Sequence, residues 1–163
     1  MLKFLRGFGY AFRGIGVCLY KERNMRVHLV AAVCVLLFGS RFSFTATEWA
    51  LLWVCIGLVM ALEAVNTAFE RLCDKVCKQK DPVIKQVKDI AAGGVLLVAL
   101  GAVGVGVCLF WRPGVWQALW QEACHQPWLF FWLVVGAGIA LLFITGWPWA
   151  KRRQPIKTPD KQK

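Results

Sequence analysis

Two long segments of this chain contain no charged residue, and they constrain its fold more than any other feature. They are residues 90–111 and 128–150. A helix that crosses a bilayer needs about 20 consecutive apolar residues, so each segment predicts a transmembrane helix. Residues 27–44 and 49–72 are apolar with a few polar interruptions and predict two more. Because backbone groups in hydrocarbon must hydrogen-bond to one another, we expect an all-α integral membrane protein with four spans.

The basic residues are distributed unevenly between the two sides of such a bundle. Of the 20 lysines and arginines, six precede the first predicted span, six lie around the connection between the second and third spans, and six lie in the tail 151–163. Only Arg41 and Arg112 fall in the other two connections. Cytoplasmic segments carry an excess of lysine and arginine. Both termini and the central connection are therefore predicted to face the cytoplasm, as in a protein of the cell (inner) membrane.

The net charge of +11 is explained by this topology and by attraction to anionic lipid. No motif for binding RNA or DNA accompanies the charge. Nucleic acid is therefore not an expected partner.

The first residues have the pattern of an amphipathic helix. Apolar side chains gather on one face of it: Phe4, Phe8, Ala11 and Ile15. Another face carries Lys3, Arg6, Tyr10 and Arg13. A helix of this kind lies in the plane of the membrane interface, so we expect a surface helix before the first span.

Three polar residues, Glu63, Asn66 and Glu70, interrupt the second predicted span. Their spacing of i, i+3 and i+7 puts them on one face of a helix. An ionised carboxylate in hydrocarbon costs about 3 kcal/mol even on lenient insertion scales. Two carboxylates and an amide therefore require a metal ion, a polar partner or a reaction. Asp74 continues the same face toward the membrane surface.

Other charged residues are expected at the depth of this face. Glu22 precedes the first span, and Lys88 and Asp89 begin the third. Short cytoplasmic connections would bring them beside Glu63 and Glu70. Carboxylates with cations close by suit phosphoryl transfer: hard oxygen ligands hold Mg²⁺, cations neutralise the phosphoryl group, and a carboxylate accepts a proton from an alcohol.

Two other interpretations compete with a kinase. Polar residues in spans often do no more than hold neighbouring helices together. Alternatively, Glu63 and Glu70 could bind a cation or proton in a small channel or transporter. Glu22, Lys88 and Asp89 favour the kinase, because an ion path would not require them. The sequence has no G-x-x-x-x-G-K-[ST] phosphate loop, so an ATP site would be built from helix ends and these polar residues.

The order and spacing of these motifs resemble one family. The matching segments are Glu22-Arg-Asn-Met-Arg26, Glu63-Ala-Val-Asn-Thr-Ala-Phe-Glu70 followed by Asp74, and Lys88-Asp-Ile-Ala-Ala-Gly93. Over residues 1–114 the chain resembles the small integral-membrane lipid kinases of bacteria, the prokaryotic diacylglycerol kinase and undecaprenol kinase family.

The resemblance implies an ATP-dependent lipid kinase that forms a homotrimer of three-span protomers, with active sites shared between neighbours at the cytoplasmic interface. It implies that Glu63 is the base on the lipid hydroxyl, and that Glu22 and Glu70 bind the Mg²⁺ of ATP. It places Glu22 and Glu70 in the nucleotide site with further residues: Tyr10, Asn66, Asp74, Lys88 and Asp89. Lys3 stands where the family has an arginine near the substrate, which implies a substrate-binding role.

The resemblance also bears on the substrate. Relatives specific for diacylglycerol tend to carry serine where this chain has Ala11 and Ala92. The segment from Glu22 to Arg26 is more similar to the undecaprenol kinase branch. Undecaprenol is therefore the favoured substrate, with diacylglycerol as the alternative.

The C-terminal part departs from the family. The kinase domain is expected over 1–114, a short outer loop and an extra transmembrane helix over 115–150, and a basic cytoplasmic tail over 151–163. Gly136 and Gly138 would allow the extra helix to pack closely. The expected fold is a surface helix, a three-span kinase bundle and one extra C-terminal span around the trimer.

Overall fold

A computed structural model describes residues 2–77, 79, 81–125 and 127–146. The basic tail predicted over 151–163 lies outside these residues, as do the side chains at positions 2, 3, 5, 127, 129 and 130. The described part of the chain is helical and contains no strand. Its helices are α1 (Leu2–Lys21), α2 (Arg23–Gly39), α3 (Ala46–Val76), α4 (Pro82–Phe110), α5 (Pro113–His125) and α6 (Pro127–Thr145). The predicted all-α fold is confirmed.

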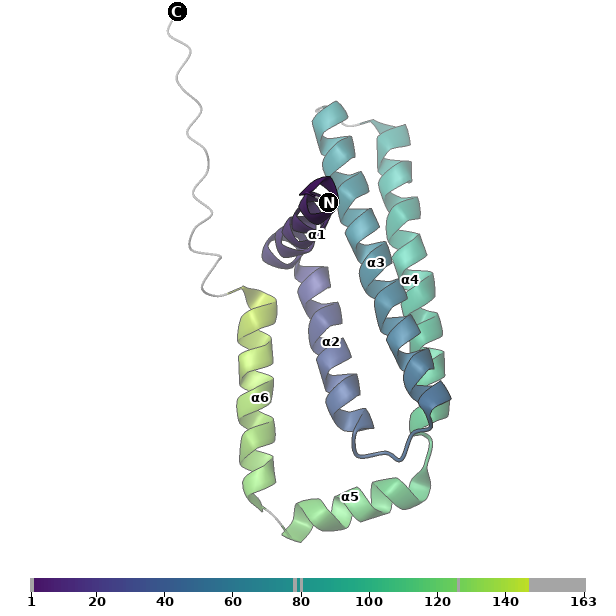
Figure 1. The fold of residues 1–163 in the computed structure, drawn as a ribbon, viewed down its shortest axis with the longest axis vertical. Coiled ribbons are helices and arrows are strands. Elements are labelled where there is room, and N and C mark those ends of the chain that lie inside the picture. The colour runs from purple at the N-terminus through teal and green to yellow at the C-terminus, as the bar shows by residue number, and fades with distance from the viewer. Residues whose placement is uncertain (1, 78, 80, 126, 147–163) are drawn as a thin grey trace, which may run out of the picture.

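Four of the helices run up and down side by side, in the spatial order α6, α2, α3, α4 (Figure 1). The closest pairing is between α3 and α4, while α6 packs against α2. The connection between α3 and α4 lies at one end of this bundle, and the corner between α1 and α2 lies beside the middle of α3, where α2 and α6 have their ends nearer to that connection (Figure 1). Both basic segments therefore lie toward the same end, as the charge pattern predicts. We call this half of the bundle the α3–α4 end, and the opposite half the α5 end.

Two of these helices are long and apolar enough to cross a membrane, by length and composition. They are α3, with 31 residues, and α4, with 29. Residues 131–145 of α6 form a shorter apolar helix, and α2 has 17 residues. The predicted first and fourth spans therefore correspond to helices, each shorter than the segment from which it was predicted.

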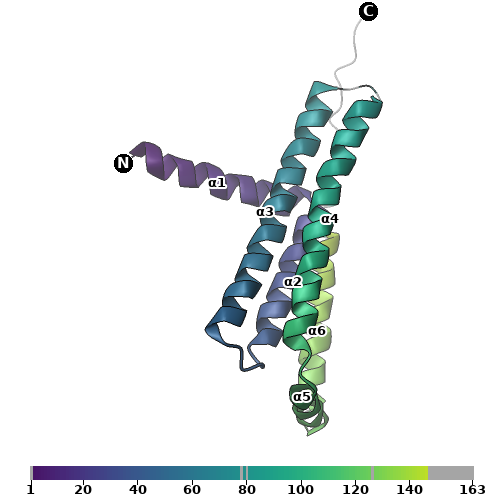
Figure 2. The same ribbon diagram turned by 90° about the vertical axis from the view of Figure 1, so that its right-hand side faces the viewer.

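The α1 helix leaves the bundle at a steep angle, and Figure 2 shows its N-terminal half projecting to one side. Its aromatic residues are mostly exposed, with Phe4 and Phe8 in an edge-to-face contact at 5.1 Å. An amphipathic helix that leaves a bundle sideways suits the membrane interface. This arrangement agrees with the surface helix predicted from the sequence.

The helix starts follow from local sequence. Thr45 caps α3: its hydroxyl accepts from the Glu48 amide, and the Glu48 carboxylate accepts from the Thr45 amide at 2.8 Å, which is a capping box. Asp81 caps α4 by accepting from the amides of Val83 and Ile84 at 2.7 and 3.2 Å. Pro82 follows at the first helical position, where the missing N–H is no loss.

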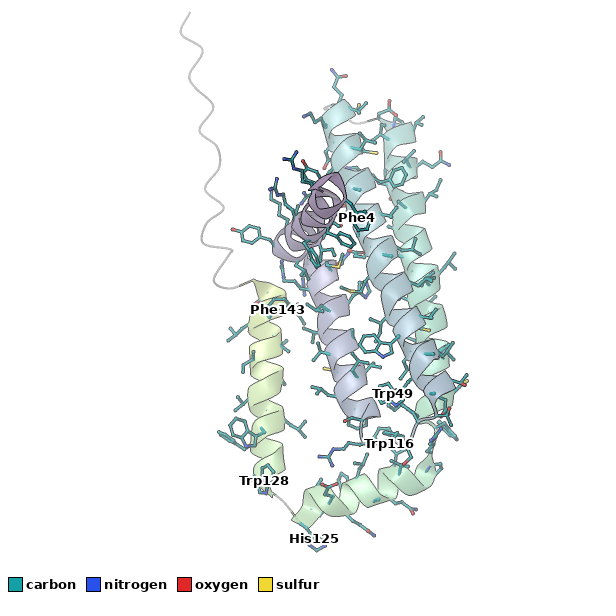
Figure 3. The ribbon with its side chains drawn as sticks, in the orientation of Figure 1. Phe4, Trp49, Trp116, His125, Trp128 and Phe143 are labelled. Carbon is teal, nitrogen blue, oxygen red and sulfur yellow. The ribbon has the colours of Figure 1, made fainter. Side chains whose placement is uncertain are left out.

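The prediction of a short outer loop after residue 113 is wrong, because this segment forms α5. The sequence interpretation took its two prolines as loop boundaries, but Pro113 begins a helix instead. Trp116 fixes the start of α5, since its indole donates to the carbonyl of Phe110 at 2.8 Å. The same indole stacks near Phe38 and Phe42, with ring centroids 5.4 and 6.0 Å apart. Figure 3 shows Trp116 directed from α5 toward the connection between α2 and α3.

Arg112 holds this end of the bundle together. Its guanidinium pairs with the Glu48 carboxylate, donates to the carbonyl of Ser43 at 3.3 Å, and lies 5.1 Å from the centre of the Phe44 ring. These contacts join the start of α5 to the α2–α3 connection and to the first turn of α3. A second pair, Arg41 with Glu122 at 3.1 Å, is about half exposed and ties α5 to the same connection.

Arg112→Gln is expected to destabilise the protein by about 1–2 kcal/mol, because a partly buried ion pair and a cation–π contact are lost together. The matched change Arg41→Gln removes an exposed pair and should cost less than about 1 kcal/mol. Thermal unfolding in detergent, followed by circular dichroism, measures both changes. Equal shifts in the two variants would contradict this account of Arg112.

Candidate active site

The polar face predicted on α3 is present, and its deeper part is buried. Glu63 and Asn66 are only 3% and 6% exposed, and Thr67 beside them is 3% exposed. The Asn66 amide nitrogen lies 3.5 Å from a Glu70 carboxylate oxygen, one turn along the helix. Its own amide oxygen is buried and has no hydrogen-bond partner among the described residues. A buried acceptor without a donor is costly, so this oxygen is a candidate contact for a bound ligand.

Glu22 reaches this face from a different part of the chain. It is the single residue between α1 and α2, with an extended backbone, and its side chain does not cap α2. The carboxylate instead pairs with Arg71 of α3 at 3.4 Å. It also lies close enough to Glu63 to repel it, as does Glu70. The structure therefore gathers three carboxylates from two segments at the α3–α4 end.

Arg71 was missed by the sequence interpretation, which counted it only toward the charge of the central connection. A signal for it was present: Arg71 follows Glu70 directly, so it leaves α3 on a neighbouring face. That face looks toward the α1–α2 corner, where Glu22 lies. Arg71 therefore supplies a cation beside the carboxylates.

Lys88 of α4 completes the charged set. Its ammonium group pairs with the Asp74 carboxylate across the α3–α4 connection and also interacts with the charge of Glu70. The short connection and the close packing of α4 on α3 produce this pairing. Two cations, Lys88 and Arg71, thus lie among four carboxylates, those of Glu22, Glu63, Glu70 and Asp74. We call these six residues the charged cluster.

An open cavity of about 670 Å³ adjoins the cluster at the α3–α4 connection. Asp74, Asp81, Lys85 and Lys88 contribute charged side chains to its lining. Ligand pockets for small molecules usually measure about 300–1,000 Å³, so the cavity is large enough for part of a nucleotide. Its two lysines suit phosphate groups.

Three predicted site residues are not joined to the charged cluster within this chain. Tyr10 is 67% exposed on α1, in the part of the chain that projects from the bundle. Asp89 is exposed and forms no ion pair with a described residue, because it follows Lys88 and so points about 100° further round the helix. The side chain of Lys3 lies outside the described residues.

The cluster contains the oxygen ligands that a hard cation needs. No group of three or more His, Cys, Asp and Glu side chains in the described part of the chain forms a ready metal site. Mg²⁺ does not require one, since it is usually bound by one or two carboxylates together with substrate phosphates and water. Glu22 and Glu70, whose charges both act on Glu63, offer two carboxylates for such a partial ligand set.

Comparison with known proteins shows the family of this chain. The family model for prokaryotic diacylglycerol kinase matches residues 9–110 of the chain. The chain belongs to this family. The matched region runs from α1 to the end of α4 and contains the whole charged cluster. It leaves α5 and α6 outside.

Individual relatives agree with this assignment. The chain is 34% identical over 108 residues to an undecaprenol kinase of Bacillus subtilis, a match that covers 66% of this chain and 88% of the relative. It is 39% identical over 110 residues to a diacylglycerol kinase of Synechocystis, covering 67% of this chain and 63% of the relative. A diacylglycerol kinase of Escherichia coli is 24% identical over 109 residues, covering 67% and 89%.

Family membership supports lipid-kinase function and a location in the membrane. The resemblance predicted from the sequence motifs is thereby confirmed. The comparisons offer no support for the channel or transporter that the sequence had left open.

Proposed function

We propose that this protein transfers the γ-phosphoryl group of ATP to the hydroxyl group of undecaprenol, giving the lipid phosphate and ADP. The observation that carries the proposal is the buried carboxylate of Glu63, placed within interaction distance of Glu22 and Glu70 in a bundle of the diacylglycerol kinase family. A buried, acceptor-rich cluster of this kind suits an alcohol and a magnesium nucleotide that meet at the membrane surface.

Glu63 is the proposed base. The lipid hydroxyl oxygen forms a bond to the γ-phosphorus, the bond from that phosphorus to the bridging oxygen of ADP breaks, and the hydroxyl proton passes to the Glu63 carboxylate. Glu63 lies two turns, or about 10 Å, deeper along α3 than Glu70. One helix face can therefore span from a lipid hydroxyl to the nucleotide phosphates.

Glu22 and Glu70 are the proposed ligands of the Mg²⁺ that accompanies ATP. The ion would supply charge neutralisation on the phosphates. Lys88 is held by Asp74 at the side of the same cavity, where its ammonium group can contact a phosphate. The unpartnered oxygen of Asn66 can accept a hydrogen bond from the nucleotide or the lipid.

The proposed assembly is a homotrimer with sites shared between chains, in the inner membrane with both termini cytoplasmic. Two observations support the sharing. Tyr10, on the projecting helix α1, and Asp89, on α4, are both exposed and form no ion pair with the cluster of their own chain among the described residues. In the proposed trimer, these two residues would contribute to the cluster of a neighbour.

Diacylglycerol is the second candidate substrate, because the Synechocystis relative named for it is 39% identical to this chain. Undecaprenol is favoured by Ala11 and Ala92 and by the segment from Glu22 to Arg26, which resemble the undecaprenol kinase branch, and a relative named undecaprenol kinase is 34% identical to this chain. The two lipids differ in the group that carries the hydroxyl, which is a polyprenyl chain in one and a glycerol with two acyl esters in the other.

A competition assay in detergent decides between the two lipids. With Mg²⁺-ATP and equal amounts of undecaprenol and diacylglycerol, we expect kcat/KM to favour undecaprenol at least about tenfold, which corresponds to about 1.4 kcal/mol of transition-state discrimination. Radiolabelled phosphate in each extracted lipid measures the ratio. A preference for diacylglycerol would overturn the substrate, and no transfer to either lipid by folded protein would overturn the proposed function.

A further inference from the structure

Arg26 is buried at the corner between α1 and α2, and its contacts connect three helices. The side chain is 6% exposed. One guanidinium nitrogen, Nη1, donates to the carbonyls of Leu19 and Tyr20 in the last turn of α1, at 3.1 and 3.2 Å. Another nitrogen, Nε, donates to the carbonyl of Ile144 at 3.2 Å, in the last turn of α6. Arg26 itself belongs to the first turn of α2.

The carbonyl groups that Arg26 contacts have no hydrogen-bond donor within their own helices. The last four carbonyls of an α-helix lack an intrahelical donor and carry the negative end of the helix dipole. In α1 the Cys18 carbonyl accepts from the Glu22 amide at 2.8 Å, and the next two carbonyls, those of Leu19 and Tyr20, accept from Arg26. In α6 the Phe143 carbonyl accepts from the Gly146 amide at 3.2 Å, and the next carbonyl, that of Ile144, accepts from Arg26. One buried cation is thus balanced by two helix C-termini.

Gly146 shapes the contact on the α6 side. It follows the last residue of α6, is buried, and has φ = 65°, a conformation that glycine adopts without strain. A Cβ atom at this position would lie 3.3 Å from the Nη2 nitrogen of Arg26. Figure 3 labels Phe143 at this end of α6, next to the α1–α2 corner. By contrast, a Cβ at Gly138 in the middle of α6 would meet no atom within 4 Å.

The α1–α2 corner, which Arg26 holds, also contains Glu22. Glu22 lies between the end of α1 and the start of α2, one helical turn before Arg26. Its carboxylate receives no cap contact from α2 and depends on the position of the corner to reach Arg71 and Glu63. We propose that Arg26 is a positioning residue through which α6, the helix outside the family match, fixes this corner and holds Glu22 in place for Mg²⁺-ATP. This inference rests on the proposed role of Glu22.

Three variants of the full-length protein test the inference in detergent with Mg²⁺-ATP and undecaprenol. Gly146→Ala strains the end of α6 and crowds the guanidinium. Arg26→Lys keeps the charge but loses the planar fork that reaches both helix ends. Gly138→Ala is the matched control on the same helix. We expect the first two changes to raise KM for Mg²⁺-ATP about three- to tenfold, the size of one weakened charge-assisted hydrogen bond, and the control to leave it unchanged.

A purely structural defect would lower the amount of active enzyme without changing KM for one substrate alone. We therefore expect KM for undecaprenol to stay constant in all three variants. The double variant with both Gly146→Ala and Arg26→Lys should be no worse than the more severe single variant, because both act on one contact. An unchanged KM for Mg²⁺-ATP in Gly146→Ala, an equal rise in Gly138→Ala, or full additivity in the double variant would overturn the inference.

Hydrogen–deuterium exchange separates this inference from the proposed function, since it needs no catalysis. We expect Gly146→Ala to speed exchange of the amides at positions 19–24, including the Glu22 amide bonded to Cys18, relative to Gly138→Ala. Unchanged exchange would show that α6 does not hold the corner, whatever the protein phosphorylates. Faster exchange in a protein that phosphorylates no lipid would instead overturn the proposed function and leave the docking of α6 intact.

Discussion

Glu63→Gln is expected to lower kcat for lipid phosphorylation by about a hundredfold or more, while the protein still binds Mg²⁺-ATP. General bases contribute about 10²–10⁴-fold to rate. Glutamine has almost the same shape as glutamate but cannot accept the hydroxyl proton. Since Glu63 is 3% exposed and is repelled by Glu22 and Glu70, removing its charge should not destabilise the bundle. Transfer of labelled phosphate to lipid measures kcat, and a fluorescent ATP analogue measures nucleotide binding.

Glu122→Gln is the matched control for this change. Glu122 is a glutamate that pairs with Arg41, and it belongs to α5 at the far end of the bundle from the charged cluster. Its substitution should leave kcat within about twofold of the unsubstituted protein, because exposed pairs contribute little. If Glu63→Gln retained full activity, or if Glu122→Gln lost as much, Glu63 would not be the base.

The α3 helix shows how far sequence alone can go. The i, i+3, i+7 spacing of Glu63, Asn66 and Glu70 was sufficient to place them on one face, because helical geometry fixes the direction of each side chain. The placement of Lys88 at the depth of this face also followed from sequence, since a short connection forces α3 and α4 to lie antiparallel; its pairing with Asp74 comes from the structure. Helix geometry and short loops are local properties, so they can be predicted from patterns in the sequence.

Contacts between distant segments were not predictable in the same way. Arg26 appeared in the sequence only as the last residue of a family motif, yet one of its partners, Ile144, lies 118 positions away. No periodicity links two such positions. The helix α5 was missed for a different reason: its sequence is bounded by prolines, and whether a proline begins a helix or ends a loop depends on what the neighbouring side chains contact.

Tyr10 and Asp89 show a third limit to what the sequence predicts about the site. The family resemblance assigned both to the nucleotide site, but one chain leaves them exposed and apart from the charged cluster. If the site is shared between chains, as proposed, the geometry of one chain cannot complete it. The residues assigned to the nucleotide site therefore divide into those that one chain gathers and those that it leaves exposed.

Glu70→Gln should weaken binding of Mg²⁺-ATP about ten- to a hundredfold, because a neutral amide replaces the carboxylate that we propose as a ligand of the Mg²⁺ ion. The change preserves the local structure. The glutamine oxygen can still accept from the Asn66 amide, which lies 3.5 Å from the present carboxylate. Loss of one negative charge also relieves the repulsion from Glu63. A fall in binding would therefore reflect a lost ligand and not a damaged fold.

The sharpest measurement is the comparison of the two glutamate variants with each other. Glu63→Gln should lower kcat at nearly constant affinity for Mg²⁺-ATP, whereas Glu70→Gln should raise KM for Mg²⁺-ATP and shift the Mg²⁺ titration of activity to higher concentration. The two residues lie on the same helix face, undergo the same chemical change and differ by two turns of depth. If both variants lost kcat alone, or both lost nucleotide affinity alone, the division between a base near the lipid and a metal ligand near the nucleotide would be wrong.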